Sequence, residues 1–166
     1  MSEDAPVNIA YIDAANLDRA VRELKWKLDY KKFRVWLSDK YNIQQAYIFI
    51  GLIPKYKDLY TYFQKCGFTL VFKEVVYQGN GSPKGNCDTD LIVQAFDDAY
   101  EGKLGKALLV SSDGDYAPLV KKLQTKEQFL AILSPAPAKK CSILLKRTNA
   151  KIAYINDQRK LLERKG

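Results

Sequence analysis

The fold is decided by the stretch Ala107–Val120, ALLVSSDGDYAPLV, in which an unbroken apolar run is followed by two aspartates and then by a helical pattern. The run Ala107–Ser112 is typical of a strand in a parallel sheet that is covered on both faces. The apolar spacing after it predicts a helix that begins near Tyr116. Asp113 and Asp115 therefore follow the carboxyl end of a buried strand, which is where open α/β sheets bind their ligands.

The same alternation of strand and helix extends over the rest of the chain. Short apolar or β-prone runs predict further strands at 8–12, 46–53, 68–77, 129–133 and 152–155, and helical spacing predicts helices at 14–28, 29–41, 58–66, 88–100 and 141–147. Strands that alternate with helices of this length form parallel βαβ units with right-handed crossovers, which place helices on both faces of one sheet. We therefore expect an α/β fold, a three-layer α/β/α sandwich around a mostly parallel central sheet.

Length and composition fit a single domain over residues 1–166, with a core at about 8–157 and a charged C-terminal tail. A chain of 166 residues forms one hydrophobic core comfortably, whereas a second core would be cramped. Hydrophobic residues make up 47% of the sequence and charged residues 28%, which excludes a disordered or collagen-like chain. The 27 Lys and Arg residues outnumber the 19 Asp and Glu residues, so the net charge of +8 favours a polyanionic partner such as nucleic acid.

Rare and missing residue types exclude several kinds of site. Cys66, Cys87 and Cys141 lie far apart without CxxC spacing, so neither a disulfide framework nor a zinc site is indicated. The chain contains no histidine, which excludes Ser/His/Asp and Cys/His catalysis, and any metal would be held by oxygen. No apolar run approaches the ~20 residues needed to cross a bilayer, and MSEDAPVN lacks the pattern of a signal peptide. We therefore expect a cytoplasmic protein without a membrane partner.

Aspartates gather where the predicted strands end. Asp13 directly follows the strand at 8–12, and Asp113 and Asp115 follow the strand that ends at Ser112. Because the carboxyl ends of parallel strands meet at one edge of a sheet, these three side chains should converge. Like charges that lie close together need a cation or a shared proton, and Mg²⁺ and Mn²⁺ take oxygen ligands. The sequence therefore predicts a divalent metal site at this edge.

Four aspartates also have a purely structural interpretation. Asp88 and Asp90, in GNCDTDL, stand at the start of the helix predicted at 88–100, where capping and the helix dipole favour acidic residues. Asp115 would cap the helix that follows it, and Asp13 would form an Asx-turn. The glycine-rich segment GNGSPKGN matches neither of the usual phosphate-binding glycine patterns, so a dinucleotide site is not indicated. The combination of the acids, more than any one of them, predicts a site.

Three segments carry a resemblance to a known family: YIDAANL at 11–17, KGNCDTDL at 84–91 and LVSSDGDYAPLV at 109–120. With these motifs in this order, the chain resembles the NYN domain family, a branch of the PIN-like nuclease superfamily, and in particular its LabA-like bacterial members. The likeness extends from about Ile9 to Leu162, which is nearly the whole chain.

The resemblance implies a PIN-like, Rossmann-like topology and a ribonuclease that hydrolyses phosphodiester bonds of single-stranded RNA with the help of Mg²⁺ or Mn²⁺. Such a metal would polarise the phosphate and activate a water, so no protein nucleophile is needed. The residues that the resemblance assigns to metal binding are Asp13, Asp88, Asp90, Asp113 and Asp115. Those assigned to catalysis are Asp13, Asp88, Asp113 and Asp115.

The resemblance also implies contacts with the substrate. Asn16 would position Asp13 or bind RNA, and Lys84 would neutralise a phosphate, although a lysine in a loop is more often simply solvated. Ser111 and Ser112 would support the site through hydrogen bonds. An aromatic set has the helical spacing of core residues, with base stacking as the alternative: Tyr56, Tyr60, Tyr62 and Phe63.

Two departures from the family pattern keep other functions open. Gln94 stands where many members have a further acid, and Ser112 replaces the usual glycine before the aspartates. These departures favour, as an alternative, an inactive RNA-binding or scaffold module. A third hypothesis is a metal-dependent phosphatase of a small substrate, which would use the same carboxylates but would not need the positive charge. A homodimer through an exposed apolar face is compatible with the sequence, although no single segment marks it.

Overall fold

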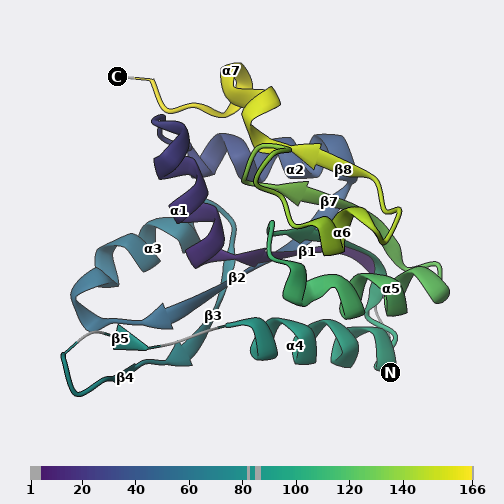
Figure 1. Cartoon of the computed structure of the whole chain (residues 1–166), viewed down its shortest axis with the longest axis horizontal. Helices are drawn as coiled ribbons and strands as arrows, with labels where there is room; N and C mark the ends of the chain where they lie inside the picture. Colours follow the sequence, from purple (N-terminus) through teal and green to yellow (C-terminus); the bar gives the residue numbers. More distant parts are fainter. Residues whose placement is uncertain (1–4, 82, 85–86, 166) are drawn as a thin grey trace.

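Six parallel strands form the central sheet, in the spatial order β3-β2-β1-β6-β7-β8 (Figure 1). The computed structural model describes residues 5–81, 83–84 and 87–165. The strands of this sheet are β1 (Val7–Asp13), β2 (Ile43–Leu52), β3 (Thr69–Glu74), β6 (Leu104–Val110), β7 (Phe129–Ser134) and β8 (Ile152–Tyr154). The fold is α/β, and its parallel central sheet is the one that the alternating pattern predicts.

Helices cover both faces of the sheet, because alternate residues of each strand point to opposite sides. On β1, Ala10 and Ile12 pack into one core, and Ile9 and Tyr11 pack into the other. Figure 1 shows the two layers of helices, with α1 and α4 on opposite sides of the sheet. The first layer contains α1 (Ala14–Leu24), α2 (Tyr30–Tyr41), α3 (Lys57–Lys65) and α7 (Arg159–Leu162). The second contains α4 (Asp88–Tyr100), α5 (Ala117–Thr125) and α6 (Ile143–Lys146).

The β1/β6 pair is the topological switch point of the sheet. The chain forms β1, β2 and β3 in one direction across the sheet and then returns to place β6 on the other side of β1. In an open α/β sheet the ligand crevice lies at this point, outside the carboxyl ends of the strands. Asp13 is the last residue of β1, and Ser111 directly follows β6. The topology therefore brings two of the aspartate-bearing motifs to the same crevice.

The strand predicted at 68–77 divides in two. β3 ends at Glu74 because its partner β2 ends at Leu52, which pairs with Glu74. The next residues form β4 (Val76–Tyr77), which pairs antiparallel with β5 (Pro83–Lys84) in a separate ribbon. A strand needs a neighbour for its backbone hydrogen bonds, and β2 offers none beyond Leu52.

The segment after β8, expected to be a charged tail, packs onto the body of the protein. It forms the 3₁₀ helix η3 (Ile155–Gln158) and then α7, and Leu162 is fully buried. The Asp29 amide donates to the Leu162 carbonyl at 2.8 Å, which ties this segment to the start of α2. Two further 3₁₀ helices, η1 (Pro54–Tyr56) and η2 (Gly114–Tyr116), precede α3 and α5. Within the described ranges, no helix has the length and apolar character needed to cross a membrane.

Candidate metal centre

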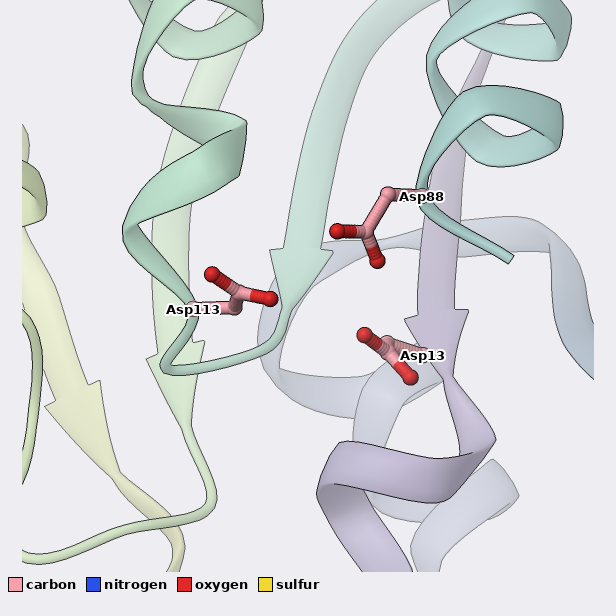
Figure 2. A group of neighbouring side chains, drawn as sticks. All are labelled: Asp13, Asp88 and Asp113. Carbon is pink, nitrogen blue, oxygen red and sulfur yellow. The ribbon is translucent and has the colours of Figure 1, made fainter. Parts of the chain in front are cut away.

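Three carboxylates meet at the switch point of the sheet. Asp13 comes from the end of β1, Asp88 from the first residue of α4, and Asp113 from the loop after β6 (Figure 2). One oxygen from each carboxylate lies within 4.8 Å of the other two. Asp13 is 6% exposed, and the other two side chains are partly buried. This spacing and this set of oxygen donors suit a hard divalent cation such as Mg²⁺ or Mn²⁺.

Asp13 is held by the start of α1. Its Oδ1 accepts a hydrogen bond from the Asn16 amide at 3.1 Å, so Asp13 is the N-cap of this helix. The strand therefore passes into the helix at the residue that enters the site. Asp13 can cap α1 and belong to the site at the same time, because its second oxygen, Oδ2, is free of the cap and contacts the Tyr116 hydroxyl inside the site.

Asn16 connects the β1 motif to the β6 motif. Its Oδ1 accepts hydrogen bonds from the Ser112 amide at 3.0 Å and from the Ser112 hydroxyl at 3.1 Å. The Ser111 hydroxyl accepts from the Asp113 amide at 3.1 Å. Asn16, Ser111 and Ser112 are buried. These side chains therefore fix the loop that carries Asp113, and the family resemblance implies such a supporting role for the two serines.

Asp90 and Asp115, the other predicted acids, lie outside this group of three. Asp113 caps η2 by accepting from the Asp115 amide at 2.9 Å, and the Asp115 side chain is exposed. Asp90 lies two residues further along α4 than Asp88, and its carboxylate is 3.9 Å from the Lys73 ammonium. Lys84 belongs to β5, and its side chain falls outside the described part of the structure.

Tyr116 is a member of the site that the sequence did not predict. Its side chain is fully buried, and its hydroxyl lies 3.0 Å from Asp13 Oδ2 and 2.9 Å from Asp88 Oδ1. A phenol has one proton, so it can donate to only one of the two carboxylates at a time. Burial, and then the charges of Asp13 and Asp88, raise the pKa of Tyr116 well above its usual range. The hydroxyl therefore stays protonated, and the two carboxylates share a single donor.

The electrostatics of the site favour a bound cation. Burial is the main cause that raises the pKa of Asp13, and the nearby charge of Asp113 adds to it. Hydrogen bonds from Asn16 and Tyr116 and the charge of Arg19 act in the opposite direction. A cation among the carboxylates would offset both the desolvation and the repulsion. The residues therefore fit a divalent metal.

The neighbouring thiol does not compete for this role. Cys87 precedes Asp88, and burial together with the charges of Asp13 and Asp90 raises the pKa of the Cys87 thiol to about 11. Metal coordination by cysteine requires the thiolate. At neutral pH the site therefore offers carboxylate oxygens, not sulfur, which again favours a hard cation.

The three acids open into a cavity of about 650 Å³. One part of its wall comes from α1, and another comes from the segment that joins β2 to α3. The volume lies within the range of roughly 300–1,000 Å³ that is usual for ligand sites. Substrate could therefore reach the carboxylates from this side.

The comparisons with known proteins agree with this site. The model of the NYN domain matches residues 8–155, which include all three acids. The chain belongs to the NYN domain family. NYN domains are PIN-like and are typically nucleases that use divalent metals and bind RNA, so the chain belongs to a nuclease family and carries an acidic triad that could bind a metal.

A solved structure shares the fold of this NYN domain. A protein of unknown function from Vibrio parahaemolyticus superimposes with a TM-score of 0.72, and the match covers 99% of this chain and 100% of that one. The two sequences are 20% identical, so the likeness concerns the fold. No curated protein matches the chain.

Gln94 has a structural partner in this NYN domain. Its amide donates to Asp98 Oδ1 at 2.9 Å, and the Tyr11 hydroxyl donates to Asp98 Oδ2 at 2.7 Å. Asp98 is 2% exposed, so these two neutral donors compensate its burial. An acid at position 94 would place a second negative charge against Asp98. The glutamine at position 94, which departs from the family pattern, therefore serves as a hydrogen-bond donor to a buried carboxylate of this chain.

Proposed function

We propose that this protein is a metal-dependent ribonuclease that hydrolyses phosphodiester bonds of single-stranded RNA. The observation that carries the proposal is the convergence of Asp13, Asp88 and Asp113, from three separate elements, within 4.8 Å in the lining of a cavity. The membership of a nuclease family and the net charge of +8 support RNA as the substrate.

Mg²⁺ or Mn²⁺ would be held by these three carboxylates. When bound, such an ion supplies a Lewis acid that polarises the phosphate and lowers the pKa of water. Asn16 and Ser112 keep Asp13 and the Asp113 loop in place. The hydroxyl of Tyr116 supplies a proton between two of the ligands, which limits their repulsion. The protein side chains thus preorganise the site, and none of them needs to act as a nucleophile.

The remaining predicted acids take lesser roles in this proposal. Asp115 is an exposed acid beside the centre, and its backbone orients Asp113. Asp90 forms an ion pair with Lys73 and does not bind the metal directly. Lys84 would contact a phosphate from the β4–β5 ribbon.

The test is cleavage of a labelled single-stranded RNA by purified protein in Mn²⁺, in Mg²⁺ and in EDTA. The variant Asp13→Asn removes one carboxylate and keeps the N-cap, because asparagine caps a helix as well as aspartate does. Asp39→Asn is the matched control, since Asp39 is an exposed acid of α2. We expect cleavage by the wild type and Asp39→Asn in metal, and a loss of at least 100-fold in Asp13→Asn.

Other outcomes favour the alternatives. Equal cleavage by all three proteins would indicate a contaminating ribonuclease and contradict the proposal. RNA binding without cleavage would favour the inactive scaffold that Gln94 suggested. Turnover of a nucleotide or sugar phosphate, without cleavage of RNA, would favour the phosphatase.

A further inference from the structure

The cavity beside the acids has a charged side and an apolar side. On α1 it is lined by Ala15, Asp18, Arg19 and Arg22, whose spacing of three and four residues places them on one face of the helix. On the other side it is lined by residues of the β2–α3 connection, of the first turn of α3 and of the segment after β3: Ile53, Tyr56, Leu59 and Val75. We name the space between these two sets the slot. It is continuous with the carboxylates, because Asp13, Asp88 and Asp113 line the same cavity.

Arg19 is the cation of the slot that is available to a ligand. Arg22 forms an ion pair with Asp18, one turn before it on α1. Arg19 is exposed and has no hydrogen bond or ion pair within residues 5–81, 83–84 and 87–165. It lies six residues after Asp13, about 9 Å along the helix axis. A guanidinium in this position suits a phosphate that neighbours one held at the carboxylates.

Tyr56 and Leu59 form an exposed apolar wall. Each is 42% exposed although each lines a cavity, so the wall has no partner of its own within the described structure. The Lys55 ammonium lies over the Tyr56 ring, 5.1 Å from its centre, which places a positive charge against one face of the ring. An aromatic ring beside a cation is the arrangement on which proteins stack bases of single-stranded nucleic acid.

The wall is preorganised by a buried tyrosine. The Tyr60 hydroxyl donates to the Gly51 carbonyl at 2.9 Å and accepts from the Ile53 amide at 3.0 Å, and Tyr60 is 6% exposed. A Cβ on Gly51 would lie 2.7 Å from Val75 Cγ2, so glycine lets the segment after β3 approach the end of β2. The turn that presents Tyr56 is therefore fixed before any ligand binds, which lowers the entropic cost of binding.

We infer that the slot binds one nucleotide of single-stranded RNA next to the scissile bond, with its base against Tyr56 and Leu59 and its phosphate on Arg19. This inference rests on the proposed function, because it takes the carboxylates as the place of cleavage. A purely apolar ligand would leave the Arg19 charge without a partner, and a simple anion would leave the Tyr56 wall uncovered. A nucleotide satisfies both sides of the slot.

The experiment measures the binding of a fluorescein-labelled five-nucleotide RNA by fluorescence anisotropy, in EDTA and in Ca²⁺. We expect Tyr56→Ala to weaken binding about tenfold, the loss expected for one unstacked base, and Tyr56→Phe to bind like the wild type. Tyr62→Ala is the matched control, because Tyr62 is 43% exposed on α3 but does not line the cavity. It should change the affinity less than twofold.

The charged side is tested in the same way. Arg19→Gln should weaken binding about fivefold and reduce the slope of log affinity against log salt by about 0.7, the value for one phosphate of a single strand. Arg147→Gln removes the same charge from an exposed residue that does not line the cavity. It should leave the affinity within twofold. An abasic nucleotide at the position bound by the slot should abolish the difference between wild type and Tyr56→Ala.

The outcomes separate this inference from the proposed function. Equal effects of Tyr56→Ala and Tyr62→Ala, equal effects of Arg19→Gln and Arg147→Gln, or no RNA binding by the wild type in either buffer would overturn the slot. If the protein cleaves RNA in metal but each slot variant binds RNA like its control, the proposed nuclease function is supported and the slot is contradicted. Binding that depends on Tyr56 and Arg19, without cleavage in any metal, would support the slot and contradict the nuclease.

Discussion

The hydroxyl of Tyr116 lies 2.9 Å from Oδ1 of Asp88. The same hydroxyl is 3.0 Å from Oδ2 of Asp13, so one proton serves two carboxylates at the centre of the site. This arrangement limits the repulsion in the metal-free protein, and a cation would take over the same task. The stability of the folded protein should therefore depend on both the Tyr116 hydroxyl and the metal. Either one should partly compensate for the loss of the other, because both reduce the repulsion between the carboxylates.

Tyr116→Phe tests this exchange, because it keeps the buried ring and removes the hydroxyl. In EDTA the free energy of unfolding should fall by about 1.5–3 kcal/mol, the range for a hydrogen bond to a charged group, which lowers Tm by about 3–12 °C. In saturating Mn²⁺ the loss should be smaller, since the cation offsets the repulsion. Thermal unfolding in both buffers measures the difference.

Tyr11→Phe is the control for this variant. It removes a buried hydroxyl that donates to Asp98, which lies outside the group of three acids, so it should lower Tm by the same amount with and without metal. If Tyr116→Phe behaved in the same way, the hydroxyl would have no special relation to the metal ligands.

Asp13→Asn should make the metal-free protein more stable at neutral pH. Burial and the charge of Asp113 raise the pKa of Asp13 in the folded state above its unfolded value. Such a group stabilises the fold when it is protonated, below its unfolded pKa, and this contribution is lost as the pH rises through the folded pKa. At pH 7 asparagine avoids that loss, and its amide can donate to Tyr116 while the phenol donates to Asp88.

The measurement is Tm against pH, from pH 4 to pH 8, in EDTA. The difference between Asp13→Asn and wild type should grow as the pH rises through the raised pKa, and Mn²⁺ should stabilise the wild type but not the variant. Asp39→Asn, an exposed substitution on α2, should follow the wild type under all these conditions. A lower Tm for Asp13→Asn at pH 7 in EDTA would show that the carboxylate stabilises the fold without a metal, against this expectation.

The sequence predicted which acids follow the central strands, but it did not predict which acid of α4 joins them or that Tyr116 belongs to the site. Asp13 and Asp113 follow buried strands on either side of the switch point, and hydrophobic patterning alone indicates this arrangement. The choice between Asp88 and Asp90 depends on helix geometry, because residues two apart on a helix point about 200° away from each other. That choice requires knowing which face of α4 packs on the sheet.

Tyr116 could not be found in this way, because it looks like an ordinary apolar residue at the start of a helix. Its role arises from long-range packing: Asp13 lies 103 residues and Asp88 lies 28 residues before it in the chain. The one available signal was its place directly after the aspartates of SSDGDY. Similarly, the 3₁₀ conformation of η2 directs Asp113 toward the other acids and leaves Asp115 exposed. The hydrophobic pattern does not predict the backbone conformation of such a short turn.

Gln94→Glu should destabilise the protein and should not increase cleavage. The substitution replaces a donor to the buried Asp98 with a like charge, so we expect a loss of about 1–3 kcal/mol in the free energy of unfolding. Gln94→Met, which removes the hydrogen bond without adding a charge, should lose less. Urea unfolding and RNA cleavage, measured on both variants, check this. Greater cleavage with unchanged stability would mean that position 94 serves the active centre in this chain.

Gly114→Ala should disturb the metal site through a contact outside it. A Cβ on Gly114 would collide with the Ser142 hydroxyl, and it would lie 3.1 Å from Leu144 Cδ1. The Ser142 amide donates to the Ser112 carbonyl at 3.2 Å, and Ser112 in turn binds Asn16. Displacement of Ser142 should therefore reach the loop that positions Asp113. We expect a loss of stability of about 1–3 kcal/mol and an affinity for Mn²⁺ that is about tenfold weaker.

The double variant Gly114→Ala with Ser142→Gly separates the collision from other effects of the added methyl group. Removing the Ser142 side chain makes room for the Cβ, and it costs little at the N-cap of α6 because glycine is tolerated there. Titration of Mn²⁺ by calorimetry should show the affinity restored to within about threefold of the wild type, the remainder reflecting the lost cap. If the single and double variants bound Mn²⁺ equally weakly, the effect would come from the backbone of η2 itself, and the contact between η2 and α6 would have no part in holding Asp113.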